Sequence, residues 1–467
     1  MYKDICCAAH SQDKRKTEKM RKEMVKKIHF ILLTCSLLLG LYSISIIELL
    51  QMSLLYRLLI EVAGGIIVIL ILIFPQKREF ENGRLKQMYA GVCLLQLFLF
   101  SSMLGIILFF FCWNTLNFSW KVLLAQGIIF LLGEALVFWC GMIRIFVTSV
   151  QLGMKWRILG ALFGFVPIVN LCILIHMIRL VSNEIEFETE KVELDQVRVE
   201  SKVCQTRYPL LLVHGVFFRD FRYLNYWGRI PKALTKNGAT IFYGEQESAA
   251  SVEDCGRFIA ERIRRVLELT GAEKVNIIAH SKGGLDSCFA VSQCGMDRYV
   301  ASITTVNTPH LGCNFADYLL EKIPAKVREQ IASKYDAALK RLGDQSPDFL
   351  AAVKDLTATG CKSLSSQLKI PAGVYCQSVA SKLNRPQSGK FPLNLTNRFV
   401  SMFDGENDGL VSFPSMRWGE KCYEVRVSGK RGVSHGDVID LNRENIPEFD
   451  VREFYIQLVK DLKERGL

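Results

Sequence analysis

The sequence predicts two unlike halves. The first is an N-terminal all-α transmembrane bundle of four or five spans, and the second is a C-terminal α/β domain with a doubly wound, mostly parallel sheet and a helical cap. Three observations predict this division. The chain of 467 residues has a mean hydropathy of +0.20 although 22% of its residues are charged. Long uncharged apolar runs are confined to the region before residue 180, and beyond it short β-rich runs alternate with helical patterns.

Five apolar segments approach the length of about 20 helical residues that crosses a bilayer core roughly 30 Å thick. They are 30–47, 58–74, 88–113, 122–143 and 158–178. The fourth carries Glu134, which either marks a polar site or, more simply, pairs with His176 inside the bundle or extends to the interface. The fifth contains Pro167 and Asn170, so it is either a kinked span or a re-entrant hairpin.

The basic residues predict how these segments are oriented. Nine Lys or Arg residues lie within 3–27, four within 77–86, and Lys155 and Arg157 follow the fourth segment. Because cytoplasmic loops are enriched in Lys and Arg, we expect the N-terminus in the cytoplasm, and topology rather than nucleic-acid binding explains much of the net charge of +12.

The side of the C-terminal domain depends on the fifth segment. If that segment crosses, the domain lies outside the cytoplasm, which is the alternative we favour; if it is re-entrant, the domain lies in the cytoplasm. Eight cysteines after residue 200, with no close CxxC pair, oppose the favoured alternative because unpaired thiols are typical of a reducing compartment.

We divide the chain into a basic cytoplasmic arm (1–29), a transmembrane domain (30–180), a linker (181–206) and the α/β domain (207–467) with a cap near 313–360. In the α/β domain six runs are expected as strands: 209–213, 240–243, 275–279, 300–306, 398–403 and 422–427. Four runs have helical patterns: 227–236, 252–269, 282–294 and 449–462.

The most specific motif follows the third expected strand. That buried run ends at Ser281, with the small residues Ala279 and Gly283 two positions before and after it, and a helical pattern then begins. This spacing is typical of a nucleophile elbow, in which a serine occupies a strained turn and bulky neighbours at those two positions would collide.

A serine nucleophile needs a base and an acid, which follow it in the order acid and then histidine in this class of site. Of the seven histidines, only His435 follows at the required place. Asp408 stands in the turn after the last-but-one expected strand and is the candidate acid, with Asp404 and Glu406 as fallbacks. The simpler alternatives are a turn-forming Asp408 and a surface His435.

Such a site also needs backbone amides that stabilise an oxyanion. One is expected from Lys282, directly after the serine. The other is expected from Val216 in the loop after the first strand, because Gly215 lets the backbone approach closely. The alternative is that His214-Gly215 forms an ordinary turn.

In combination these motifs resemble the bacterial triacylglycerol lipases of the α/β-hydrolase superfamily, the true-lipase group of pseudomonads and their relatives. The matching segments are 208–215, 226–231, 269–284, 300–312, 407–412 and His435, and none lies in the membrane half. The resemblance implies hydrolysis of carboxylic esters through an acyl-enzyme. It places the nucleophile, acid and base on Ser281, Asp408 and His435, and the oxyanion donors on the amides of Val216 and Lys282.

Three features depart from that group. Lys282 adds a cation beside the nucleophile, which either favours anionic head groups or points to solvent. Asp437 matches one ligand of the group's calcium site, but the segment with the other acidic ligand is shortened, so we expect no cofactor. The cap segment 325–342 has a predicted apolar face. This face consists of Val327, Ile331, Leu339 and Leu342. The segment either covers the site and opens on an anionic bilayer, or is an ordinary helix packed on the core.

The sequence therefore predicts a membrane-anchored serine hydrolase, a lipase or esterase, whose partners are a lipid or acyl-ester substrate and the bilayer, with no nucleic acid. A thioesterase or an acyltransferase would use the same three side chains. A third alternative is a non-catalytic membrane protein that binds lipid or a partner. The presence of all three side chains argues against it.

Overall fold

The computed structural model describes residues 24–75, 80, 82–116, 118–164, 166–198, 200–216 and 225–467. The chain divides into two compact units, Met1–Val192 and Glu193–Leu467. Most of the predicted basic arm lies outside the described residues. The boundary between the two units falls inside helix α7 (Pro167–Arg198) and within the predicted linker 181–206. Most of that predicted linker is the polar C-terminal part of α7.

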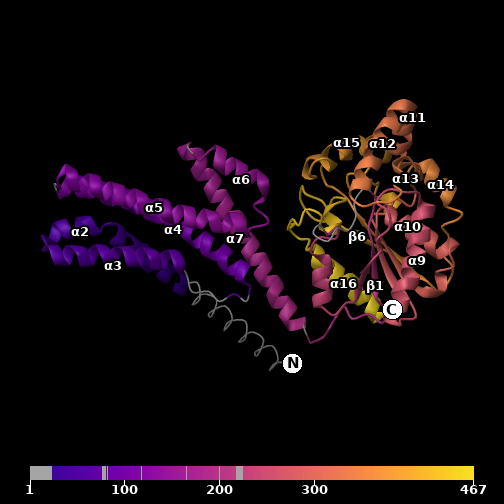
Figure 1. The fold of residues 1–467 in the computed structure, drawn as a ribbon, viewed down its shortest axis with the longest axis horizontal. Coiled ribbons are helices and arrows are strands. Elements are labelled where there is room, and N and C mark those ends of the chain that lie inside the picture. Colours follow the sequence, from indigo (N-terminus) through magenta and orange to yellow (C-terminus); the bar gives the residue numbers. More distant parts are fainter. Residues whose placement is uncertain are drawn as a thin grey trace, which may run out of the picture. The chain divides into compact units, whose positions relative to one another are not determined.

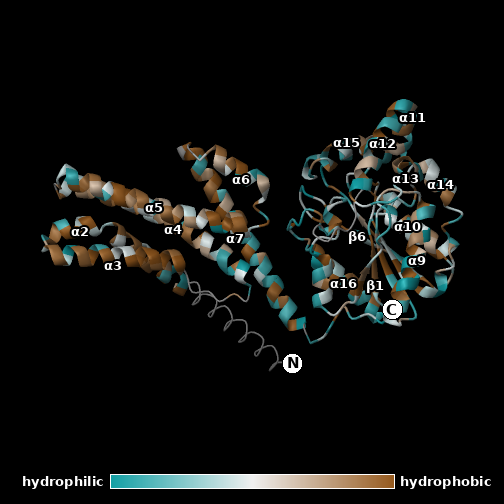
Figure 2. Cartoon of the chain, in the orientation of Figure 1, coloured by the Kyte–Doolittle hydropathy of each residue, from teal (hydrophilic) through white to brown (hydrophobic). Residues whose placement is uncertain are grey.

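The N-terminal unit is entirely helical where it is described (Figure 1). Its helices are Met24–Leu41, α2 (Ser43–Leu50), α3 (Leu54–Ile73), α4 (Gly83–Thr115), α5 (Trp120–Thr148), α6 (Gly153–Leu162) and α7. Five of them are long and apolar enough to cross a membrane: Met24–Leu41, α3, α4, α5 and the part of α7 over Ile168–Arg198. Figure 2 shows that hydrophobic residues predominate along the helices of this unit. The fifth predicted segment, 158–178, is not one helix, because α6 ends at Leu162 and α7 starts anew at Pro167.

Close helix contacts and buried polar groups hold this bundle together. Gly40 and Gly64 bring two helices to backbone contact, since a Cβ atom on Gly64 would lie 2.9 Å from the Gly40 carbonyl oxygen. Glu134 is buried and accepts a hydrogen bond from Ser102 Oγ at 2.9 Å. The predicted Glu134–His176 pair is wrong, because the His176 ring instead lies 4.0 Å from the ring of Trp156.

The C-terminal unit contains a six-stranded, fully parallel sheet in the order β2-β1-β3-β4-β5-β6. The strands are β1 (Leu210–Val213), β2 (Ile241–Tyr243), β3 (Val275–His280), β4 (Val300–Val306), β5 (Tyr375–Ser381) and β6 (Lys421–Val425). The main helices outside the cap are α8 (Ile230–Lys236), α9 (Val252–Thr270), α10 (Lys282–Gln293), α15 (Leu393–Asp404) and α16 (Val451–Glu464). Short 3-10 helices occupy Asp297–Tyr299, Pro386–Ser388, Pro414–Met416 and Asp437–Ile439.

Helices cover both faces of the sheet, as predicted for a doubly wound fold. In β1, Leu210 and Leu212 pack with α8 and α16 in one apolar core. The alternate residues Leu211 and Val213 pack with α9 and α10 in a second core on the opposite face. Because successive side chains of a strand point to opposite faces, the apolar run of β1 feeds both cores.

Two element predictions are wrong. Residues 398–403 belong to helix α15 rather than to a strand, and the fifth strand is β5, which the sequence reading missed. In α15 the inward positions include Asn397 and Val400, three residues apart as one helix face requires. In β5 the polar side chains of Gln377, Ser378 and Ser381 are fully buried, which hides the strand from an apolar pattern.

The cap consists of α11 (Asn314–Lys322), α12 (Ala325–Arg341), α13 (Phe349–Asp355) and α14 (Ala358–Leu364), so its last helix extends beyond the predicted range 313–360. The predicted apolar face of α12 is divided. Leu339 is buried with 6% exposure, whereas Val327 and Leu342 are 42% and 54% exposed. The cap helix therefore packs on the core through Leu339 and leaves a second apolar stripe on its outer side.

Candidate active site

Ser281 lies at the sharp turn between β3 and α10. Its φ of 55° and ψ of −131° place a non-glycine residue in a strained backbone region. Two hydrogen bonds hold this conformation: Ser281 N donates to the Val306 carbonyl at 2.8 Å, and Thr308 Oγ1 donates to the Ser281 carbonyl at 2.8 Å. A Cβ atom on Gly283 would lie 2.2 Å from the His214 carbonyl oxygen, so the turn requires glycine there.

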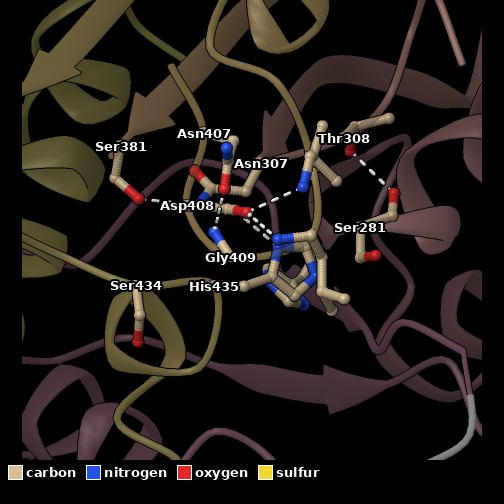
Figure 3. A network of polar contacts seen from close by, with 12 residues as sticks. Ser281, Asn307, Thr308, Ser381, Asn407, Asp408, Gly409, Ser434 and His435 are labelled. Atoms are coloured by element: carbon tan, nitrogen blue, oxygen red, sulfur yellow. Dashed lines mark hydrogen bonds and ion pairs between the residues drawn. The ribbon is translucent and has the colours of Figure 1, made fainter. Parts of the chain in front are cut away.

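His435 and Asp408 form a close side-chain pair (Figure 3). The His435 Nδ1 atom lies 2.6 Å from Asp408 Oδ2, and the His435 amide donates to the Asp408 carbonyl at 2.9 Å. The carboxylate is fully buried and accepts three more hydrogen bonds. The donors are Leu410 N at 2.9 Å and Val411 N at 2.8 Å to Oδ1, and Asn307 Nδ2 at 2.7 Å to Oδ2. Asp408 is thus held in one orientation with one oxygen toward the imidazole.

The two fallback acids have other partners. Asp404 accepts hydrogen bonds from Asn314 and from the Phe315 amide at the start of α11. Glu406 is 66% exposed and forms an ion pair with Lys382 at 2.5 Å. Of the three candidates, the structure therefore brings Asp408 to His435, although the segment before it is a helix and not the expected strand.

The imidazole of His435 lies between the Asp408 carboxylate and Ser281 in the close view (Figure 3). Among the described residues, Ser281 Oγ makes no hydrogen bond to His435. Such contacts are often long in enzymes without substrate and tighten when substrate binds. The arrangement therefore brings together all three side chains that the sequence singled out.

Tyr226 and His280 join this cluster and were not predicted as site residues. The His280 ring centroid lies 4.5 Å from that of His435, and His280 Nδ1 lies 2.6 Å from the Tyr226 hydroxyl. Because that hydroxyl oxygen accepts the Gly215 amide at 3.0 Å, its proton is available to His280 Nδ1. Burial, together with the adjacent His435, holds the pKa of His280 well below its usual range, so His280 stays neutral.

The Gly215 loop is pressed against the serine. A Cβ atom on Gly215 would lie 2.8 Å from Ser281 Cβ and 2.7 Å from the Tyr226 hydroxyl, so only glycine fits. The next residue, Val216, is half-buried and packs against the cap cluster of Ala249, Leu339 and Ala352. The chain after Val216, residues 217–224, lies outside the described residues. The backbone that carries one expected oxyanion donor thus passes beside Ser281 and under the cap.

Comparisons with known proteins identify the fold and the family of this domain. A sequence model of the α/β hydrolase fold matches residues 208–357. The triacylglycerol lipase of Vibrio cholerae serotype O1 is 32% identical over 289 residues, which cover 56% of this chain and 90% of that protein. The chain belongs to the triacylglycerol lipase family of α/β hydrolases. Its C-terminal domain is an enzyme of the lipase and esterase class.

Further relatives of this lipase domain are more distant. The triacylglycerol lipase of Pseudomonas fragi is 28% identical over 294 residues, covering 56% of this chain and 98% of that protein. The crystal structure of Staphylococcus hyicus lipase has a TM-score of 0.44 and 16% identity, covering 56% of this chain and 97% of that chain.

The Lys282 side chain of the lipase domain is buried, so the expectation that it points to solvent is wrong. Its Nζ atom lies 2.6 Å from Asp286 Oδ1 and 3.3 Å from the Ser251 carbonyl, and both charged side chains are buried. Burial raises the pKa of the Asp286 carboxyl, and the Lys282 ammonium opposes that shift. The pair anchors the first turn of α10, next to the backbone amide that the sequence predicted as an oxyanion donor.

The residues present do not fit the calcium site of the lipase group. Asp437 Oδ2 accepts the Ser434 amide at 3.0 Å, and the Arg431 guanidinium lies 3.3 Å from the same carboxylate. A cation beside this aspartate would meet the positive charge of Arg431. No group of three or more potential metal ligands exists among the described residues. We derive no step through calcium.

Proposed function

We propose that this chain is a membrane-anchored serine hydrolase that cleaves carboxylic esters of acyl or lipid substrates through an acyl-enzyme. The observation that carries the proposal is the 2.6 Å contact between Asp408 Oδ2 and His435 Nδ1, with the imidazole beside a serine held at a φ of 55°. A serine hydroxyl is a weak nucleophile until a neutral imidazole removes its proton.

In the first half-reaction, Ser281 Oγ attacks the ester carbonyl carbon while His435 Nε2 takes the hydroxyl proton. The carbonyl oxygen becomes an oxyanion, which the amides of Val216 and Lys282 stabilise. The bond to the alcohol oxygen then breaks, and the imidazolium returns the proton to the departing alcohol. The acyl group remains bound to Ser281 Oγ.

In the second half-reaction, water attacks the acyl carbon and gives its proton to His435 Nε2. The bond to Ser281 Oγ breaks, the serine regains its proton, and the carboxylic acid leaves. Asp408 keeps the Nδ1 proton on the far side of the ring, so that the Nε2 lone pair faces the serine. Because three donors hold the buried carboxylate, it stabilises the imidazolium without rotating away.

Two features support action at a bilayer. Five helices of the N-terminal unit are apolar and long enough to span one, and a tethered enzyme meets membrane substrate at high local concentration. In the cap, α12 exposes Val327 and Leu342 while Leu339 packs near Val216. Contact of that outer stripe with lipid would draw α12 away and uncover the loop beside Ser281.

A fluorophosphonate probe tests the nucleophile in the full chain. We expect wild-type protein to be labelled and Ser281→Ala to lose labelling and ester hydrolysis together. The matched control is Ser292→Ala in the same helix, whose hydroxyl bonds only to the Cys288 and Gln367 carbonyls. Labelling that persists in Ser281→Ala and disappears in Ser292→Ala would contradict the assignment.

Substrate panels separate the ester reaction from the alternatives with the same side chains. Aryl esters of increasing chain length and emulsified triacylglycerol divide esterase from lipase. Acyl thioesters, with and without an alcohol acceptor, report thioesterase or acyltransferase activity. We expect oxygen esters to be hydrolysed faster than thioesters of the same acyl chain, and the reverse order would favour a thioesterase.

A further inference from the structure

Helices α6 and α7 connect the last long span to the hydrolase domain, and their path decides which side of the membrane that domain occupies. Helix α6 has 10 residues, Gly153–Leu162, and therefore rises about 15 Å. That length is half of a hydrocarbon core roughly 30 Å thick. Helix α6 alone does not cross the bilayer.

Helix α7 folds back along α6. Only residues 163–166 connect the two helices, and the ring of Trp156 in α6 lies 4.0 Å from the ring of His176 in α7. A Cβ atom on Gly160 would lie 3.5 Å from Met177 Sδ, so the second half of α6 also contacts α7. Figure 1 shows α6 beside the first part of α7, as in a helical hairpin.

The buried carboxylate of Glu184 shows where α7 returns. It accepts hydrogen bonds from Ser149 Oγ at 2.6 Å and from the amides of Val150 and Gln151, each at 3.1 Å. It also forms an ion pair with Arg84. Arg84 stands in the first turn of α4, and Ser149 directly follows the last residue of α5. Glu184 therefore lies at the end of the bundle where α4 begins and α5 ends.

Helix α6 starts from that same end. Arg157 in α6 donates to the Ser149 carbonyl at 2.9 Å, and Leu152, just before α6, belongs to one apolar core with Leu85 and Ile185. The chain thus leaves one end of the bundle at residue 149 and is back at it by residue 184. From Glu184 onward α7 is rich in charged residues, which suits the outside of the hydrocarbon.

We propose that α6 and the first half of α7 form a re-entrant hairpin that enters one leaflet and returns, with lipid tails as its partner. The hydrolase domain then lies on the side of the basic loops and the basic N-terminal arm, which is the cytoplasm. Met154 and Leu162 of α6 and Ile168 of α7 are exposed to that leaflet. This is the alternative that we did not favour from the sequence.

The state of the cysteines agrees with a cytoplasmic domain. Seven of the eight cysteines after residue 200 are free thiols among the described residues: Cys255, Cys288, Cys294, Cys313, Cys361, Cys376 and Cys422. Cys313 and Cys361 are both buried in the cap region and carry free thiols. Unpaired thiols in such number are typical of a reducing compartment. The substrate would therefore reach the site from the cytoplasmic leaflet or the cytosol.

Three variants of the full chain, each with one added cysteine, test this path in intact cells with a membrane-impermeant maleimide. The variants are Lys121→Cys in the first turn of α5, Lys155→Cys in α6, and Glu268→Cys on the exposed face of α9. We expect Lys121→Cys to react in intact cells, and Lys155→Cys and Glu268→Cys to react only after lysis. The wild-type chain supplies the background from native thiols.

Labelling of Glu268→Cys together with Lys121→Cys in intact cells would show that α7 crosses, and would overturn the proposal. A second measurement addresses the Glu184 contacts. We expect Glu184→Gln to lower the unfolding temperature of the detergent-solubilised chain by several degrees, and the exposed neighbour Glu186→Gln to leave it unchanged. Equal behaviour of these two variants would also overturn the proposal. Neither experiment depends on the proposed chemistry.

Discussion

Replacing Asp408 with asparagine changes one charge while keeping the size of the side chain. The amide oxygen still accepts from Leu410 and Val411 at the former Oδ1 position. The new NH2 group then faces two donors at the former Oδ2 position, Asn307 Nδ2 and the Nδ1 proton of His435. The His435 clash is relieved when the imidazole moves its proton to Nε2, which can then no longer accept the proton of the serine.

The expected loss is about 10⁴-fold in kcat, or about 5.5 kcal/mol of transition-state stabilisation, because a triad histidine in the wrong tautomer loses about that much. KM should change little, since Asp408 is fully buried and does not reach substrate. The assay is steady-state hydrolysis of a short-chain aryl ester by the full chain in detergent. The rate of fluorophosphonate labelling is measured in parallel and should fall by a similar factor.

The fallback acids supply matched controls. Asp404→Asn and Glu406→Gln remove carboxylates that contact Asn314 and Lys382 rather than His435, so both variants should keep activity within a few-fold of wild type. The reasoning fails if Asp408→Asn retains more than a tenth of the wild-type kcat. It also fails if Asp404→Asn loses activity to the same degree as Asp408→Asn while remaining folded.

Three further predictions concern the surroundings of the site. Tyr226→Phe removes a hydroxyl that hydrogen-bonds to the Gly215 amide and to His280, and should lower kcat about 10-fold with unchanged KM. The control Tyr455→Phe should leave kcat unchanged, because the buried Tyr455 hydroxyl has no partner among the described residues. Lys282→Met leaves Asp286 buried and unpaired, and should lower the free energy of unfolding in urea by about 3–5 kcal/mol. The double variant Lys282→Met with Asp286→Leu should recover much of that loss. Burial lowers the pKa of His310 to about 3, so in mildly acidic solution the unfolded chain binds a proton at His310 that the folded chain does not bind. This histidine therefore costs no stability above its pKa in the unfolded chain, and below pH 6.5 the free energy of unfolding falls by about 1.4 kcal/mol per pH unit. In urea titrations at pH 7 and pH 5, His310→Gln should reduce that slope.

The elbow could be predicted because its requirements are local. A strained serine needs small residues two positions away on each side, and Ala279 and Gly283 meet that requirement in the sequence itself. The buried Lys282–Asp286 pair could not be predicted in the same way. An i,i+4 pair on a helix is equally compatible with an exposed surface, and only the packing of α9 and the chain before it buries this one.

The two wrong element predictions have one physical cause. Residues 398–403 contain four apolar side chains in close succession, which resembles a strand, but the helical positions extend back to Leu393 and include the polar Asn397. Asn397 is buried because it hydrogen-bonds to Asn407 Oδ1 at 2.7 Å. Likewise Gln377 in β5 is buried because it donates to Thr304 Oγ1 at 2.9 Å. A polar side chain can be buried when partners elsewhere in the fold form its hydrogen bonds, and a local sequence pattern does not contain those partners.

The same distinction explains why the sequence could single out Asp408 as the candidate acid although the element before it was mispredicted. Two of its four carboxylate contacts come from amides two and three residues further on, so the turn around it forms largely by itself. The proposed side of the membrane rests instead on the contacts of Glu184 with Arg84 and with residues 149–151, across 100 and about 35 residues of sequence. The number of basic residues in a loop predicts the orientation of a neighbouring helix only if that helix is known to cross the membrane. Helix α6 shows that an apolar segment of suitable composition can be too short to cross. The proposed chemistry can therefore be inferred from a few short motifs, whereas the proposed compartment can be inferred only from tertiary contacts.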